Sequence, residues 1–130
     1  MKKKILIVMA NYYEQISTGL LNSAKKVLSE PTKLNLIEVP GVFEIPVTIA
    51  KNIKKYDGFI ALGCVIKGET PHFDFISKTA IDGIMKLSIE NKKPIGNGII
   101  TCFNMEQAES RKDKGSEAAK AVLSVLGSEK

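Results

Sequence analysis

The 130-residue chain has no tryptophan, one histidine and two cysteines, and each scarcity excludes a class of protein. Cys64 and Cys102 lack the spacing of a metal site, and two cysteines are too few for the disulfide scaffold of a small secreted protein. No apolar run is long enough to span a membrane, so no membrane partner is expected. We therefore expect reduced thiols in a cytoplasmic protein.

The sequence also lacks a basic stripe with interleaved aromatic residues, which argues against nucleic acid as a partner. The formal charge of +5 comes from scattered lysines and predicts a solvated surface with a mild preference for anionic substrates. The apolar run after the first lysines is short, and no small-residue cleavage site follows it. It predicts a first β-strand rather than a signal peptide. The absence of linkers and repeats predicts a single domain over residues 1–130.

Hydrophobic periodicity predicts strands that alternate with helices along the whole chain. Strands are expected at residues 5–9, 34–39, 59–66 and 95–101. Helices are expected at about residues 16–28, 43–53, 71–90, 105–110 and 116–126. This order predicts a parallel sheet with right-handed crossovers, which is a flavodoxin-like three-layer α/β/α sandwich with a four-stranded parallel sheet. Strand 34–39 is expected nearer the edge of the sheet.

The only histidine, His72, follows the apolar strand 59–66 and a glycine-containing turn. Thr70 is expected to cap the next helix, with Pro71 as its first residue and Asp74 in its first turn. A strand that leads through a turn into a helix N-terminus can bind an anion through free backbone N–H groups. An isolated histidine is more often an ordinary surface residue than a catalyst. The residues alone leave both interpretations open.

Four loops are expected to meet at the carboxyl ends of the predicted strands, where open α/β sheets bind ligands. They are residues 11–14, 40–44, 66–72 and 101–104. Three of them place an aromatic residue beside a polar one, and the fourth carries His72. Such a set suits a flat, hydrogen-bonding heterocycle together with a phosphate.

Four motifs carry a resemblance to a known family. They read VPGVFEIP (39–46), GCVIKGETPHFD (63–74), EQA (106–108) and DKGSEAA (113–119). In order and spacing the chain resembles lumazine synthase over nearly its whole length. The resemblance implies condensation of 5-amino-6-(D-ribitylamino)uracil with 3,4-dihydroxy-2-butanone 4-phosphate. It also implies the flavodoxin-like fold, two small-molecule substrates, and no metal or organic cofactor.

The resemblance further implies a role for each candidate residue. His72 is the proton-transfer residue, and Tyr12 is the aromatic that stacks on the pyrimidine. The remaining substrate-binding residues are Val42, Phe43 and Glu44 for the ribityl chain, Cys64, Val65 and Ile66 for the pyrimidine through main-chain groups, and Asn97 beside the ring. The phosphate-binding residues are Gly68, Glu69, Thr70, Arg111 and Lys114.

In the family, the counterparts of Arg111, Lys114 and segment 97–99 reach the active site of a neighbouring subunit. The resemblance therefore implies a homo-oligomer built on pentamers, with active sites between subunits and a nearly inactive monomer. The connection after Ser110 is shorter than is common in the family. In the simpler alignment with the family, Arg111 matches the arginine that holds the phosphate. In a second alignment, Arg111 belongs instead to the downstream Arg-Lys-Asp-Lys-Gly run seen in some members.

Two further departures bear on site and assembly. Asn97 replaces a phenylalanine often found beside the pyrimidine. The N-terminus is shorter than in capsid-forming members, which leaves assembly beyond a pentamer open. A non-catalytic flavin or lumazine carrier, or a cage-forming scaffold, remains an alternative because the fold alone does not decide function. A flavodoxin-type electron carrier is disfavoured, because residues 11–14 lack the Ser/Thr/Gly-rich phosphate cradle of such proteins.

Overall fold

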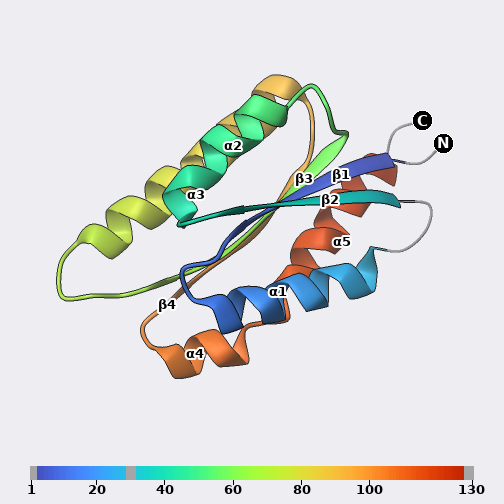
Figure 1. The fold of residues 1–130 in the computed structure, drawn as a ribbon. Helices are drawn as coiled ribbons and strands as arrows, with labels where there is room; N and C mark the ends of the chain where they lie inside the picture. The colour runs from blue at the N-terminus through green and yellow to red at the C-terminus, as the bar shows by residue number, and fades with distance from the viewer. Residues whose placement is uncertain (1–2, 29–31, 128–130) are drawn as a thin grey trace.

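The computed structural model describes residues 3–28 and 32–127, which form a parallel sheet covered by helices on both faces (Figure 1). The strands lie in the order β2-β1-β3-β4, so β2 and β4 are the edges. This is the predicted flavodoxin-like sandwich with its four-stranded parallel sheet. The strand bounds are β1 Lys3–Ala10, β2 Thr32–Val39, β3 Gly58–Ile66 and β4 Ile95–Cys102.

The helices divide between the two faces of the sheet (Figure 1). Helices α2 and α3 cover one face, and α1, α4 and α5 cover the other. Their bounds are α1 Glu14–Val27, α2 Ile45–Asn52, α3 His72–Asn91, α4 Met105–Ser110 and α5 Lys114–Gly127, with a short 3₁₀ helix, η1, at Val42–Glu44. None of the helices in the described part of the chain is long and apolar enough to cross a membrane.

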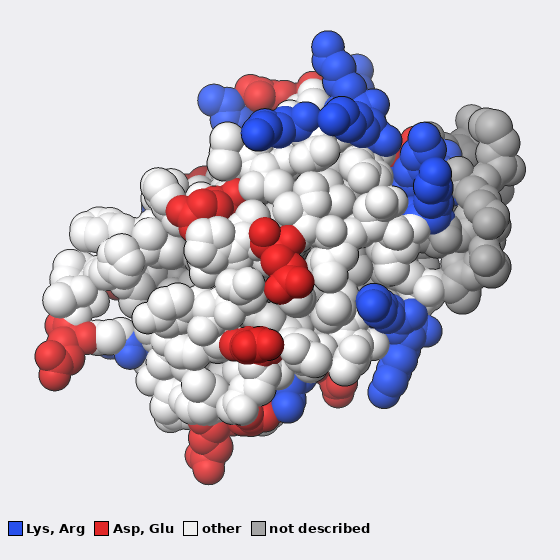
Figure 2. Space-filling model, in the orientation of Figure 1, with Lys and Arg blue, Asp and Glu red and all other residues white. Residues whose placement is uncertain are grey.

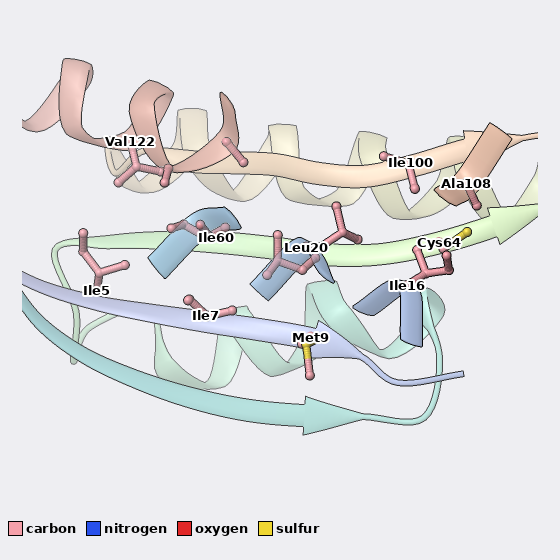
Figure 3. Packing of buried hydrophobic residues seen from close by; sticks show 14 of the residues in the cluster. Ile5, Ile7, Met9, Ile16, Leu20, Ile60, Cys64, Ile100, Ala108 and Val122 are labelled. Atoms are coloured by element: carbon pink, nitrogen blue, oxygen red, sulfur yellow. The ribbon is translucent and has the colours of Figure 1, made fainter. Parts of the chain in front are cut away.

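Each face of the sheet has its own hydrophobic core, because β1 and β3 are continuously apolar and bury both sides. In α1 the buried residues Ile16, Leu20 and Ala24 recur every four positions, which turns one stripe of the helix toward the sheet. Figure 3 shows Ile16 and Leu20 in the same cluster as Ile7 of β1 and other residues of the central strands. The two buried central strands thus give the loops at their ends a rigid base.

Four helix starts differ from the predictions, the first being that of α1, which begins at Glu14 instead of residue 16. Pro71 occupies the N-cap position of α3, and the Thr70 hydroxyl accepts a 3.3 Å hydrogen bond from the His72 N–H one residue beyond it. The prediction of Thr70 as N-cap is therefore wrong by one residue. Segment 42–44 forms a 3₁₀ turn before α2. Helix α5 begins at Lys114 instead of residue 116, so a short turn is all that separates α4 from α5.

On the face that Figure 2 shows, much of the positive charge lies toward the amino ends of the strands. Figure 2 shows Lys and Arg side chains along the upper and right-hand edges, where Figure 1 places the starts of the strands. The lysines next to these strand starts include Lys4, Lys33, Lys55 and Lys93. The predicted ligand site lies at the opposite, carboxyl ends. The net charge of the chain is thus not concentrated there, and attraction of an anionic substrate depends on a few local cations.

Candidate active site

Two pockets contain most of the residues predicted to bind substrate. The first, which we call the aromatic pocket, has a volume of about 690 Å³. Its lining residues are Tyr12, Tyr13, Gly41, Val42, Phe43, Glu44, Cys64, Val65, Ile66, His72 and Ile76. It therefore brings together three of the four loops expected at the carboxyl rim. The fourth loop, residues 101–104, contributes nothing to it among the described residues.

Gly63 explains how η1 reaches the end of β3. A Cβ on Gly63 would come within 2.6 Å of Val42 Cγ1 and 3.2 Å of the Ala10 Cβ. Because glycine has no Cβ, the buried Val42 can seat directly on β3. This contact carries Phe43 and Glu44 to the rim of the pocket. Phe43 is 57% exposed there, so it does not serve as a core residue.

The two tyrosines form the aromatic wall of the pocket. Their rings lie edge to face, with centroids 4.9 Å apart. Tyr12 is 74% exposed, so its ring is free to contact a planar ligand, whereas Tyr13 is partly buried beneath it. Burial, with smaller contributions from Tyr12 and Cys64, raises the pKa of the Tyr13 phenol. Tyr13 was not predicted as a site residue, although its position directly after Tyr12 was a signal for it.

Cys64 lies where the core meets the aromatic pocket. Figure 3 shows it at the end of the cluster where Ile16 and Ala108 also lie. Burial, with smaller contributions from Cys102, raises the pKa of the Cys64 thiol to about 12. The neutral thiol is therefore the form present at physiological pH, and Cys64 is suited to line the pocket but not to act as a nucleophile.

His72 is the first residue of α3 and lines the aromatic pocket. It is exposed, and its backbone N–H is held by Thr70 as described above. The predicted phosphate turn, Gly68 to Thr70, is also exposed and precedes His72, but it lines neither of the two pockets. Lys67 begins this turn, with its Nζ 5.3 Å from the centroid of the Phe103 ring.

The second pocket, which we call the cationic pocket, has a volume of about 470 Å³ and lies beside the edge strand β4. It contains the three remaining predicted residues, Asn97, Arg111 and Lys114. The other lining residues are Ile81, Ile99, Ile100, Thr101, Ser110, Asp113 and Glu117. The two pockets share no residue, so the described part of the chain does not bring Arg111 and His72 into the same pocket.

Local contacts orient the polar side chains of the cationic pocket. Arg111 Nη1 donates a hydrogen bond to the carbonyl oxygen of Thr101 at 3.3 Å. Lys114 Nζ lies 3.8 Å from Glu117 Oε1, in a solvent-exposed ion pair. The Asn97 side-chain oxygen accepts a 3.0 Å hydrogen bond from its own strand, at the N–H of Ile99. The result is two cations beside an open strand edge, an arrangement that suits a phosphate.

Neither pocket resembles a metal centre. Within residues 3–28 and 32–127, no group of three or more His, Cys, Asp or Glu side chains is placed to hold a metal ion. The polar groups that do line the aromatic pocket are one carboxylate, one imidazole and two phenols. They can accept hydroxyl hydrogen bonds, stack on a ring and transfer protons.

Comparisons with a family model and with individual proteins point to the same family. A family model described as 6,7-dimethyl-8-ribityllumazine synthase matches residues 2–130. A protein of that name from Agrobacterium fabrum is 43% identical over 138 residues, which covers 96% of this chain and 93% of its own length. The Bartonella tribocorum protein of the same name is 43% identical over 141 residues, covering 100% and 93%. The one from Novosphingobium aromaticivorans is 43% identical over 131 residues, covering 95% and 94%.

Proposed function

The chain belongs to the 6,7-dimethyl-8-ribityllumazine synthase family, and we propose that its active site forms where the aromatic pocket of one subunit meets the cationic pocket of the next. The reaction condenses 5-amino-6-(D-ribitylamino)uracil with 3,4-dihydroxy-2-butanone 4-phosphate. It yields 6,7-dimethyl-8-ribityllumazine, phosphate and water, in the penultimate step of riboflavin biosynthesis. Family membership favours this enzyme over the carrier and scaffold alternatives.

The observation that carries the proposal is the separation of the two pockets. The substrates join at atoms close to the phosphate-bearing chain, so the acid–base residue and the phosphate cations must act at one place. His72 and Arg111 line different pockets of one subunit, whereas the cationic pocket lies along the open edge of β4. A second subunit can therefore supply what the first one lacks.

In the proposed site the aromatic pocket holds the ribitylaminouracil. Tyr12 stacks on the pyrimidine, and Glu44 accepts hydrogen bonds from ribityl hydroxyls, for which a carboxylate has several lone pairs. The ribityl chain also passes Val42 and Phe43. The main chain at Cys64, Val65 and Ile66 contacts the pyrimidine edge, and Asn97 of the neighbouring subunit lies beside the ring.

The phosphate of the second substrate binds between the exposed turn and the neighbouring cations. Free backbone N–H groups of Gly68, Glu69 and Thr70 face it from one side. Arg111 and Lys114 of the next subunit approach from the other, with the guanidinium supplying a planar pair of donors and the ammonium a point charge. The same groups stabilise the phosphate as it departs.

The chemistry then needs orientation and one proton shuttle. The 5-amino group of the uracil attacks the butanone carbonyl and forms an imine with loss of one water. Phosphate is then eliminated, and the ribitylamino nitrogen closes the ring on the carbonyl that this leaves, with loss of a second water. Holding both substrates in one site removes much of the entropic barrier. His72 takes and gives the protons of imine formation and phosphate loss, because one imidazole nitrogen can accept a proton while the other donates one.

We propose that the assembly is a homo-oligomer built on pentamers, in the cytoplasm. Large apolar side chains are exposed on the helices that cover one face, among them Val47, Met85 and Ile89. A group of such side chains suits an interface between subunits. Cys64 and Cys102 are both free thiols, as a reducing compartment requires.

Complementation between two inactive variants tests the shared site. His72→Gln and Arg111→Gln chains with different affinity tags are co-expressed, and the mixed oligomers are purified through both tags. With the butanone phosphate held below its wild-type KM, each variant alone is expected to be nearly inactive, His72→Gln through its low turnover and Arg111→Gln through its raised KM. In a random mixture about one quarter of the sites pair an intact His72 with an intact Arg111, so activity returns toward that fraction. Mixed pentamers as inactive as the separate variants would contradict the proposal.

A further inference from the structure

One face of α1 supports the short connection between α4 and α5. Gln15, Gly19 and Ser23 follow at intervals of four residues, so they lie in a line along the helix, and we call them the α1 cradle. The connection is residues 111–113. Its first residue is Arg111, and Lys114 follows directly after its last residue, so the two cations of the cationic pocket flank it. Lys112 stands between these cations.

Lys112 is held by every member of the α1 cradle, directly or through one other residue. Its carbonyl oxygen accepts a 2.8 Å hydrogen bond from the buried Ser23 hydroxyl. A Cβ on Gly19 would overlap Lys112 Cδ, so the lysine stem occupies the space that glycine leaves open. Lys112 Nζ forms a 2.6 Å ion pair with Glu109, whose other carboxylate oxygen accepts a 3.1 Å hydrogen bond from Gln15.

We propose that Lys112 is a positioning residue: by lying in the α1 cradle, it fixes Arg111 and Lys114 in the orientation that grips the substrate phosphate. This inference rests on the proposed phosphate-binding role of those two cations. The connection is so short that anchoring its middle residue restricts the backbone on both sides. Groups that are already held in place lose less conformational freedom when the phosphate binds.

The contacts of Lys112 distinguish this role from a third phosphate contact. Arg111 and Lys114 line the cationic pocket, whereas Lys112 is absent from its described lining. The Lys112 ammonium is occupied by Glu109, and its stem is packed on α1. A lysine turned away from the pocket and held at three points is suited to orient its neighbours rather than to meet the ligand.

Gly19→Ala separates positioning from folding. The new Cβ displaces the Lys112 stem, which is flexible enough to move away at small cost. Alanine also favours the helix over glycine. We therefore expect an unchanged or higher thermal midpoint, together with a KM for the butanone phosphate raised about two- to tenfold, the effect of one ordinary hydrogen bond. The KM for the ribitylaminouracil should stay the same.

Further variants test the same point from the other contacts. Ser23→Ala releases the Lys112 carbonyl and should also raise the KM for the butanone phosphate. In a Lys112→Ala background, Gly19→Ala should not raise the KM for the butanone phosphate any further, because the lysine stem that it would displace is absent. Gly127→Ala and Lys120→Ala are matched controls on α5, since a Cβ at Gly127 meets nothing within 4 Å and Lys120 is exposed. Both should keep wild-type kinetics.

Inorganic phosphate gives a second readout, as a competitive inhibitor against the butanone phosphate. Its inhibition constant should rise in parallel with the KM in Gly19→Ala and Ser23→Ala. Unchanged values in both folded variants, or equal rises for both substrates, would overturn the positioning role; if Ser23→Ala does not fold, Gly19→Ala decides alone. Arg111→Gln is measured alongside. If it too leaves the KM for the butanone phosphate unchanged, the phosphate assignment itself has failed.

Discussion

Arg111 Nη1 and the carbonyl oxygen of Thr101 lie 3.3 Å apart, in a hydrogen bond that ties the α4–α5 connection to the carboxyl end of β4. The guanidinium retains free donors beyond this bond, and it lines the cationic pocket with Lys114. The sequence left two alignments for Arg111 open. Because Arg111 and Lys114 line the same pocket, we propose that Arg111 is the phosphate arginine.

Arg111→Gln is therefore expected to raise the KM for the butanone phosphate by about 10- to 100-fold, the loss of a hydrogen bond to a charged group. Arg111→Lys should fall between this variant and wild type, because it keeps the charge but loses the planar pair of donors. Steady-state kinetics with each substrate varied separately give the measurement. An Arg111→Gln enzyme with wild-type KM would assign the phosphate to other residues.

His72→Gln should lower kcat by about 10²-fold, the low end for one positioned acid–base group, because orientation of the substrates supplies much of the remaining rate. His72 is exposed at the start of α3, so the thermal midpoint should change by no more than about 2 °C. Lumazine formation is followed by absorbance, and the midpoint by circular dichroism. Full turnover by the folded variant would remove His72 from the proton transfers.

Local patterns in the sequence were sufficient for the fold and for the meeting of three of the four expected loops at the aromatic pocket. Apolar runs marked the central strands, and the loops at their carboxyl ends had to meet at one rim because the sheet is parallel. Asn104, of a residue type that commonly caps helices, lies at the N-cap of α4, and its side chain accepts a 2.9 Å hydrogen bond from the Gln107 N–H. These features depend on neighbouring residues along the chain.

Contacts between distant segments were beyond such patterns. Nothing near Gly19 in sequence indicates that the stem of Lys112 fills its missing side chain. The early start of α5 at Lys114 also depends on packing, because a Cβ on Gly115 would overlap the backbone of Leu20 in α1. Local patterns also do not separate the candidate residues into two pockets. The resemblance alone implied that Asn97, Arg111 and Lys114 serve a different site from His72, and the structure places these three beside the edge strand β4.

Gly96→Ala should destabilise the protein by about 1–3 kcal/mol, as overpacking does. The carbonyl of Ala118 in α5 occupies the space of the Cβ that Gly96 lacks. Backbone cannot move aside as a lysine stem can. Gly19→Ala is thus the matched contrast, with unchanged or higher stability. Urea unfolding measures both, and equal midpoints for the two variants would contradict this explanation.

Cys64 predicts how stability changes at high pH. Its folded-state pKa is raised to about 12, chiefly by burial, from an ordinary value near 9. Below about pH 9 the thiol is protonated in both the folded and the unfolded protein, and its contribution to the free energy of unfolding is complete. Between about pH 9 and pH 12 the unfolded chain loses this proton more easily than the folded protein does, so the contribution is lost as the pH rises. Between pH 8 and pH 10, the free energy of unfolding of wild type should therefore fall by on the order of 1 kcal/mol more than that of Cys64→Ala.

Urea unfolding of wild type and Cys64→Ala at the same protein concentration measures this difference, and lysine titration affects both proteins alike. If the free energies of unfolding of the two proteins fell in parallel, the thiol would ionise as easily in the folded protein as in the unfolded chain. That result would contradict the burial of Cys64 beneath the aromatic pocket.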